Sequence, residues 1–146
     1  MRPFDEVSLL RRGLLALLAL GCSGVLVELV LLEHYEEPPQ WIPMTLLLFT
    51  LVTIVWHWVE GGRKSLRMLQ TLMLLLVVAG PVGVFLHVRA NVAEEQEVNP
   101  GTGGLSFWWE VFRGELPVFA PGTLVQFGLM GLLYAYRHPA LGSPKE

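Results

Sequence analysis

Four long apolar blocks constrain the fold of this chain more than any other feature. They cover residues 13–32, 44–59, 66–88 and 121–137, and polar or charged residues separate them. A helix rises about 1.5 Å per residue, so roughly 20 apolar residues cross the hydrocarbon core of a bilayer, which is about 30 Å thick. The sequence therefore predicts an all-α polytopic membrane protein, with four transmembrane helices in an up-down bundle.

Composition favours a single membrane domain over residues 1–146. Hydrophobic residues make up 53% of the chain and charged residues 16%, which is too apolar for an ordinary small soluble domain. The formal net charge is −3, and no stretch is basic enough to bind a phosphate backbone, so nucleic acid is not an expected partner. The expected surroundings are a lipid bilayer and other protein, either subunits of a complex or further copies of the chain.

Most lysines and arginines fall on one side of the predicted spans. The other side would hold Arg89 and Arg113 together with many glutamates. Because short flanks rich in Lys and Arg stay in the cytoplasm, we expect both termini on the cytoplasmic side of a bacterial inner membrane. The residues on that side would be Arg2, Arg11, Arg12, Arg63, Lys64, Arg67, Arg137 and Lys145.

The segment 89–120 is the one sizeable region expected outside the bilayer. Residues 91–104 are polar and contain Asn99-Pro100-Gly101, which predicts a turn-rich loop. Residues 105–116 instead interleave aromatic and charged side chains, which is typical of a short amphipathic helix in the headgroup region. We expect an interfacial anchor there, and a lid over a binding pocket is the alternative.

Glu28 stands out because a carboxyl group inside a span is costly and normally faces protein or water. Counted from the ends of their blocks, Glu28 and Gln126 fall at similar depth, and Thr45, Thr50 and His87 fall in the same outer third. These five residues predict an outward-facing polar pocket for an ion, proton or ligand. The alternative is a protonated Glu28 that bonds to Gln126 and holds two helices together.

The four histidines divide by membrane side, with His34 and His87 at the outer boundary and His57 and His138 at the inner one. Two histidines from different helices could ligate a b-type haem, and Gly83 would leave room for a flat macrocycle such as haem or chlorophyll. Histidines at the ends of spans are more commonly interfacial residues, so no cofactor is predicted and a tetrapyrrole remains the alternative.

An acidic cluster beside His34 could bind Zn²⁺ or another divalent ion, but its spacing is not diagnostic, and a solvated acidic loop is the more common interpretation. The cluster consists of Glu33, His34, Glu36 and Glu37.

No common catalytic motif occurs in the chain, such as HExxH, paired CxxC, a Walker loop or Gly-x-Ser-x-Gly. The sequence therefore favours a non-catalytic accessory subunit of a larger membrane complex, for example one that handles electrons or light. A small binding or transport protein that uses the Glu28 pocket comes second. A carrier of haem or a chlorophyll-type cofactor, or an enzyme built on the histidines or the acidic cluster, comes third.

Overall fold

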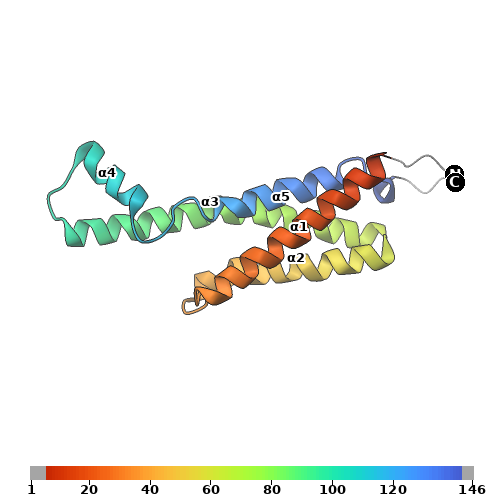
Figure 1. Ribbon diagram of the computed structural model, residues 1–146, viewed down its shortest axis with the longest axis horizontal. Coiled ribbons are helices and arrows are strands. Elements are labelled where there is room, and N and C mark those ends of the chain that lie inside the picture. Colours follow the sequence, from red (N-terminus) through yellow and green to blue (C-terminus); the bar gives the residue numbers. More distant parts are fainter. Residues whose placement is uncertain (1–5, 143–146) are drawn as a thin grey trace.

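The computed structural model describes residues 6–142, and within that range the chain is helical with no strands (Figure 1). The predicted all-α fold is therefore confirmed. Arg2 and Lys145, which the orientation argument used, lie outside the described residues. The elements are α1 (Glu6–Leu31), η1 (Pro38–Gln40), α2 (Trp41–Glu60), α3 (Arg63–Val98), α4 (Gly104–Arg113), α5 (Gly122–Ala135) and η2 (Pro139–Leu141).

Three helices are long and apolar enough to cross a membrane, namely α1, α2 with the preceding turn, and α3. This agrees with a helical membrane protein in contact with lipid. Helix α5 is apolar but has 14 residues, which corresponds to about 21 Å, less than the thickness of a hydrocarbon core. The fourth crossing over residues 121–137 stays a prediction.

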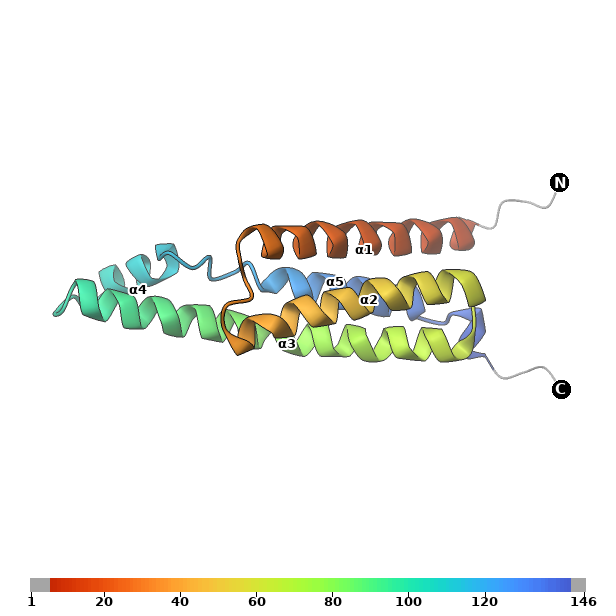
Figure 2. The same cartoon turned by 90° about the horizontal axis from the view of Figure 1, so that it is seen from below.

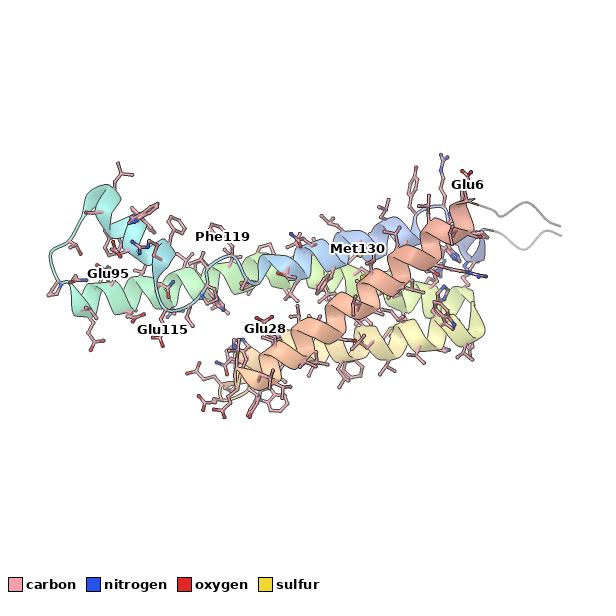
Figure 3. The ribbon with its side chains drawn as sticks, viewed as in Figure 1. Glu6, Glu28, Glu95, Glu115, Phe119 and Met130 are labelled. Atoms are coloured by element: carbon pink, nitrogen blue, oxygen red, sulfur yellow. The ribbon has the colours of Figure 1, made fainter. Side chains whose placement is uncertain are left out.

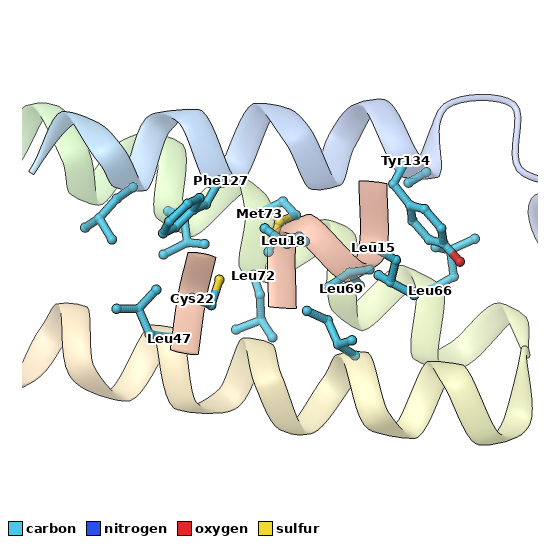
Figure 4. Close-up of a cluster of buried hydrophobic side chains, with 14 residues drawn as sticks. Leu15, Leu18, Cys22, Leu47, Leu66, Leu69, Leu72, Met73, Phe127 and Tyr134 are labelled. Carbon is cyan, nitrogen blue, oxygen red and sulfur yellow. The ribbon is translucent and has the colours of Figure 1, made fainter. Parts of the chain in front are cut away.

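The four apolar helices lie side by side and form one common core. Helix α1 packs on α2 and α5, and α3 packs on the same two helices from the other side (Figure 2). At the centre, Leu18 and Cys22 of α1 meet Met73 of α3 and Phe127 of α5 (Figure 4). Leu18, Cys22 and Met73 are fully buried, so the helices are held by tight packing.

Helices α3 and α5 approach each other most closely because glycines line their contact. A Cβ atom at Gly128 would lie 2.6 Å from the carbonyl oxygen of Met73, so no larger residue fits without moving a backbone. A Cβ at Gly83 would meet the Pro121 ring. Small residues at helix contacts allow this kind of close packing between helix backbones.

Two glycines make the turn between α2 and α3. Gly61 adopts a left-handed conformation with φ of +62°, and its N–H donates to the His57 carbonyl oxygen at 2.7 Å, which ends α2. Gly62 is the N-cap of α3. The end of the bundle that holds this turn also carries Arg11, Arg12 and Arg137, and we call it the basic end.

Helix α3 has 36 residues and extends beyond the other helices at the opposite end. The ring centroids of His34 and His87 lie 6.4 Å apart, which places the end of α1 beside His87. The 11 residues that follow, up to Val98, carry the helix about 16 Å further. We call this projection, residues 88–120, the arm.

The expectation of a turn-rich loop from residue 91 is wrong for residues 91–98, which are helical. The physical reason is that five of the eight residues of this stretch, NVAEEQEV, are good helix formers, and that Asn91 is buried against α4. The turn follows at Asn99, and α4 ends at Arg113 instead of reaching residue 116.

Candidate functional site

The structure does not bring Glu28 and Gln126 together. A Cβ at Gly21 would contact the Phe127 ring, which fixes the register between α1 and α5. Glu28 lies seven residues beyond Gly21, or about 10 Å towards the arm, whereas Gln126 is adjacent to Phe127. Both side chains are exposed, and within residues 6–142 no hydrogen bond joins them. Figure 3 shows Glu28 near the arm-side end of α1, far from Glu6.

The remaining residues of the predicted pocket lie in separate environments. Thr45 is exposed, and its hydroxyl donates to the carbonyl oxygen of Trp41 at 2.8 Å. Thr50 is fully buried on α2, and its Oγ1 has no hydrogen-bond partner in the described part of the chain. His87 Nδ1 donates to the Pro117 carbonyl oxygen at 3.0 Å, at the base of the arm. These positions do not assemble into the pocket that the sequence suggests.

The histidines expected at the outer boundary are neighbours. The rings of His34 and His87 meet edge to face, and burial together with the nearby His87 lowers the pKa of His34. Over the described ranges, no group of three or more His, Cys, Asp or Glu side chains is arranged to hold a metal ion. The glutamates beside His34 are exposed.

At the basic end, His57 is the centre of a buried chain of hydrogen bonds. Its Nδ1 lies 2.9 Å from Ser65 Oγ, and its Nε2 lies 2.8 Å from the Tyr134 hydroxyl oxygen. Ser65 Oγ donates to the Gly62 carbonyl oxygen at 3.0 Å, so its proton is already in use. His57 Nδ1–H therefore donates to Ser65, and Nε2 accepts from Tyr134. The chain links α2, α3 and α5.

Both ring nitrogens of His57 are hydrogen-bonded in this arrangement. This affects the hypothesis that His57 and His138 ligate a haem. The ring centroids of His57 and His138 are 5.5 Å apart, so these two histidines, which the sequence assigned to the same side, are neighbours in the structure. Iron ligation by His57 would require the hydrogen bond from Tyr134 to break. Ser65 and Tyr134 are functional candidates that the sequence reasoning missed. The signal for Ser65 was its position just past the Gly-Gly turn that follows His57.

A cleft of about 480 Å³ adjoins this chain and opens at the basic end. Arg11 forms part of its wall, and its guanidinium donates to the carbonyl oxygens of Tyr136 at 3.3 Å and Arg137 at 3.0 Å, which ties α1 to the end of α5. His138 Nδ1 accepts from the Ala140 N–H at 3.2 Å. Burial, Arg11 and His57, in that order, lower the pKa of His138. The lining residues are Ser8, Arg11, Arg12, Leu15, His57, Trp58, Gly61, Tyr134, His138 and Pro139.

In the arm, one buried side chain holds α4 against α3. Asn91 Nδ2 donates to the carbonyl oxygens of Val111 at 2.9 Å and Leu116 at 2.8 Å, and Asn91 Oδ1 accepts from the Leu116 N–H at 3.1 Å. A Cβ at Gly114 would lie 2.7 Å from Asn91 Cγ, so the chain passes close to the amide. Asn91 thus satisfies three backbone groups that would otherwise lose their partners as α4 ends.

The apolar stripe of α4 faces away from α3. Leu105, Trp108, Trp109 and Phe112 follow the i, i+3, i+4, i+7 spacing of one helix face, yet all four are exposed, Leu105 at 91%. The side turned to α3 carries the buried Val111 instead. Within the arm, the Phe112 ring stacks on that of Phe119, but Leu105, Trp108 and Trp109 leave an apolar surface exposed.

No protein-family model, curated protein or solved structure matches this chain. Its function has to be inferred from the geometry of the two ends, because a helical fold alone does not imply an activity.

Proposed function

We propose that this protein is a non-catalytic accessory subunit of a larger membrane complex, and that its arm docks a partner subunit on the outer side of a bacterial inner membrane. The observation that carries the proposal is the exposed apolar stripe of α4, Leu105, Trp108, Trp109 and Phe112. An amphipathic helix that does not bury its apolar face in its own chain is suited to the groove of another protein.

The proposed topology has four crossings, by α1, α2, α3 and α5. The start of α1 and the turn η2 lie at the same end of the structure, which favours an even number of crossings. The apolar residues that flank α5, Phe119 and Tyr136, extend its reach beyond its 14 helical residues. With the basic end in the cytoplasm, the positive-inside rule is satisfied, and both termini are cytoplasmic.

The orientation of α4 favours a protein as the partner of its apolar stripe over the lipid headgroup layer alone. Figures 1 and 2 show that α4 slants back from the tip of the arm towards α3 and the bundle, and does not extend at right angles to the bundle axis. The Asn91 hydrogen bonds fix this pose at the level of Val111 and Leu116. The Leu105 end of α4 therefore lies farther from the bundle than its Arg113 end, which favours contact with a protein that projects from the membrane.

Charge indicates the character of the partner surface. Acidic residues outnumber basic ones in the arm, which carries Glu94, Glu95, Glu97, Glu110 and Glu115 against Arg89 and Arg113. A groove lined by apolar residues and rimmed by Lys or Arg would be complementary to it.

Glu28 marks a second contact in the membrane. Its carboxyl group is exposed on a candidate span, and inside residues 6–142 it forms no hydrogen bond or ion pair. Such a group is stabilised when another chain supplies a donor.

The orientation can be tested by labelling. In a Cys22→Ser background, Thr102→Cys places a thiol on the arm, and Lys64→Cys places one at the basic end. A maleimide that cannot cross membranes should label Thr102→Cys in intact cells and Lys64→Cys after permeabilisation. Labelling of Lys64→Cys in intact cells would contradict the proposed topology.

The docking role can be tested with the stripe residues that pack least on the arm. The double variant Leu105→Ser/Trp109→Ser should release the partner during affinity purification from native membranes, while a Phe85→Ser control on α3 should retain it. All three side chains are at least 62% exposed, so the bundle should stay folded. Equal recovery of the same partner with both variants, measured by quantitative mass spectrometry, contradicts docking through the stripe.

A further inference from the structure

The cleft at the basic end is lined by hydrogen-bond donors without a balancing carboxylate. Its ten lining residues include two arginines, a serine, a tryptophan and two histidines, but no Asp or Glu. Its volume of about 480 Å³ is large enough for a small ligand. A site rich in donors and positive charge selects a ligand that supplies acceptors and negative charge.

The two arginines contribute differently. Arg11 binds the carbonyl oxygens at the end of α5 through one terminal nitrogen, and a guanidinium has five N–H donors, so further donors remain. Arg12 is exposed and lines the cleft, and across the described part of the chain it takes part in no ion pair or hydrogen bond. Its guanidinium is available for a ligand.

His138 adds a neutral donor of fixed direction. Because its Nδ1 accepts the Ala140 N–H, the proton of the neutral ring is on Nε2. The neutral form is favoured because burial and the nearby Arg11 lower the pKa of His138. The donor can therefore complete an anion site without adding a third positive charge to the two arginines.

We propose that this cleft binds a phosphate group, with Arg12 as its guanidinium ligand and His138 Nε2–H as a second donor. The phosphate could belong to the headgroup of an anionic phospholipid or to a soluble phosphate. The position at the end of two candidate spans suits a headgroup, and Leu15 supplies an apolar wall for the adjoining glycerol and acyl chain. This site is independent of the docking role of the arm.

The test is a calorimetric titration of the purified full-length protein in detergent with three probes. They are dioctanoyl-phosphatidylglycerol, inorganic phosphate and dioctanoylglycerol, which has no phosphate. Binding of the phosphatidylglycerol but not of inorganic phosphate supports the site with a lipid ligand. Binding of both supports it with a soluble one. Failure of both to bind, or equally tight binding of dioctanoylglycerol, overturns the proposal.

Arg12→Gln locates the binding, with Arg67→Gln as the matched control. Both arginines are exposed, and both substitutions remove one positive charge at the basic end, but Arg67 does not line the cleft. Arg12→Gln should weaken phosphatidylglycerol or phosphate binding about tenfold, as expected for loss of a charged hydrogen bond, while Arg67→Gln should leave it unchanged. Equal weakening by both variants, or none by Arg12→Gln, overturns the site.

Discussion

The two ends of this molecule use polar side chains in opposite ways. At the basic end, Tyr134, His57 and Ser65 hydrogen-bond to one another across three helices, deep in the packed bundle. In the arm, a single amide, Asn91, hydrogen-bonds to backbone groups of a segment about 20 residues further along the chain.

The difference has consequences for the surface of each end. The buried chain at the basic end links helices and leaves arginine donors along the adjoining cleft, so this end is suited to an anion. The Asn91 clamp fixes α4 with its stripe outward, so the arm is suited to an apolar partner. A rigid internal polar contact thus lies behind each of the two surfaces, and the surfaces differ in chemical character.

The largest expected effect comes from breaking the arm clamp. Asn91→Leu should destabilise the arm by about 3 kcal/mol, because the Val111 and Leu116 carbonyls and the Leu116 N–H lose their partner. Hydrogen exchange should accelerate at α4 amides and stay slow in α1 and α2. Gln96→Leu, an exposed control on the same helix whose side chain makes no hydrogen bond to the described residues, should have little effect. If exchange accelerated throughout the bundle, the arm would not be a separate unit.

A smaller effect is expected from the basic end. Tyr134→Phe removes the donor to His57 Nε2 and should reduce the free energy of unfolding by about 1 kcal/mol. Tyr136→Phe, two residues away and exposed, is the matched control. Denaturant unfolding in detergent measures both. If the two variants were equally stable, the hydrogen-bond chain would contribute little to linking α2, α3 and α5.

Acidification should have the smallest effect and act at both ends. The folded-state pKa values of His34 and His138 lie below the ordinary value of 6.5, so the unfolded chain binds more protons near that pH. Stability should therefore be complete above pH 6.5 and fall as the pH drops through and below it. The free energy of unfolding should be measured as a function of pH over this range. It should depend less on pH in the His34→Gln/His138→Gln double variant than in the unmodified protein. An unchanged pH slope in that variant would exclude both histidines as its source.

The sequence alone determined the helical class, the apolar spans and the pairing of histidines by end. Long apolar runs specify helices because a bilayer leaves backbone groups no other way to be satisfied. Helices of known rise then place His34 and His87 at one end of the spans and His57 and His138 at the other, and the tertiary structure makes the members of each pair neighbours.

Tertiary structure decided the register between helices, which side chains meet and which face of α4 is left free. The Gly21–Phe127 contact shifts α1 against α5 and separates Glu28 from Gln126, whereas depth counted along each span suggested a match. The position of α4 against α3 depends on Asn91, whose partners lie about 20 residues further along the chain. Such contacts join distant residues through side-chain shape, and no periodic pattern in a single sequence encodes them.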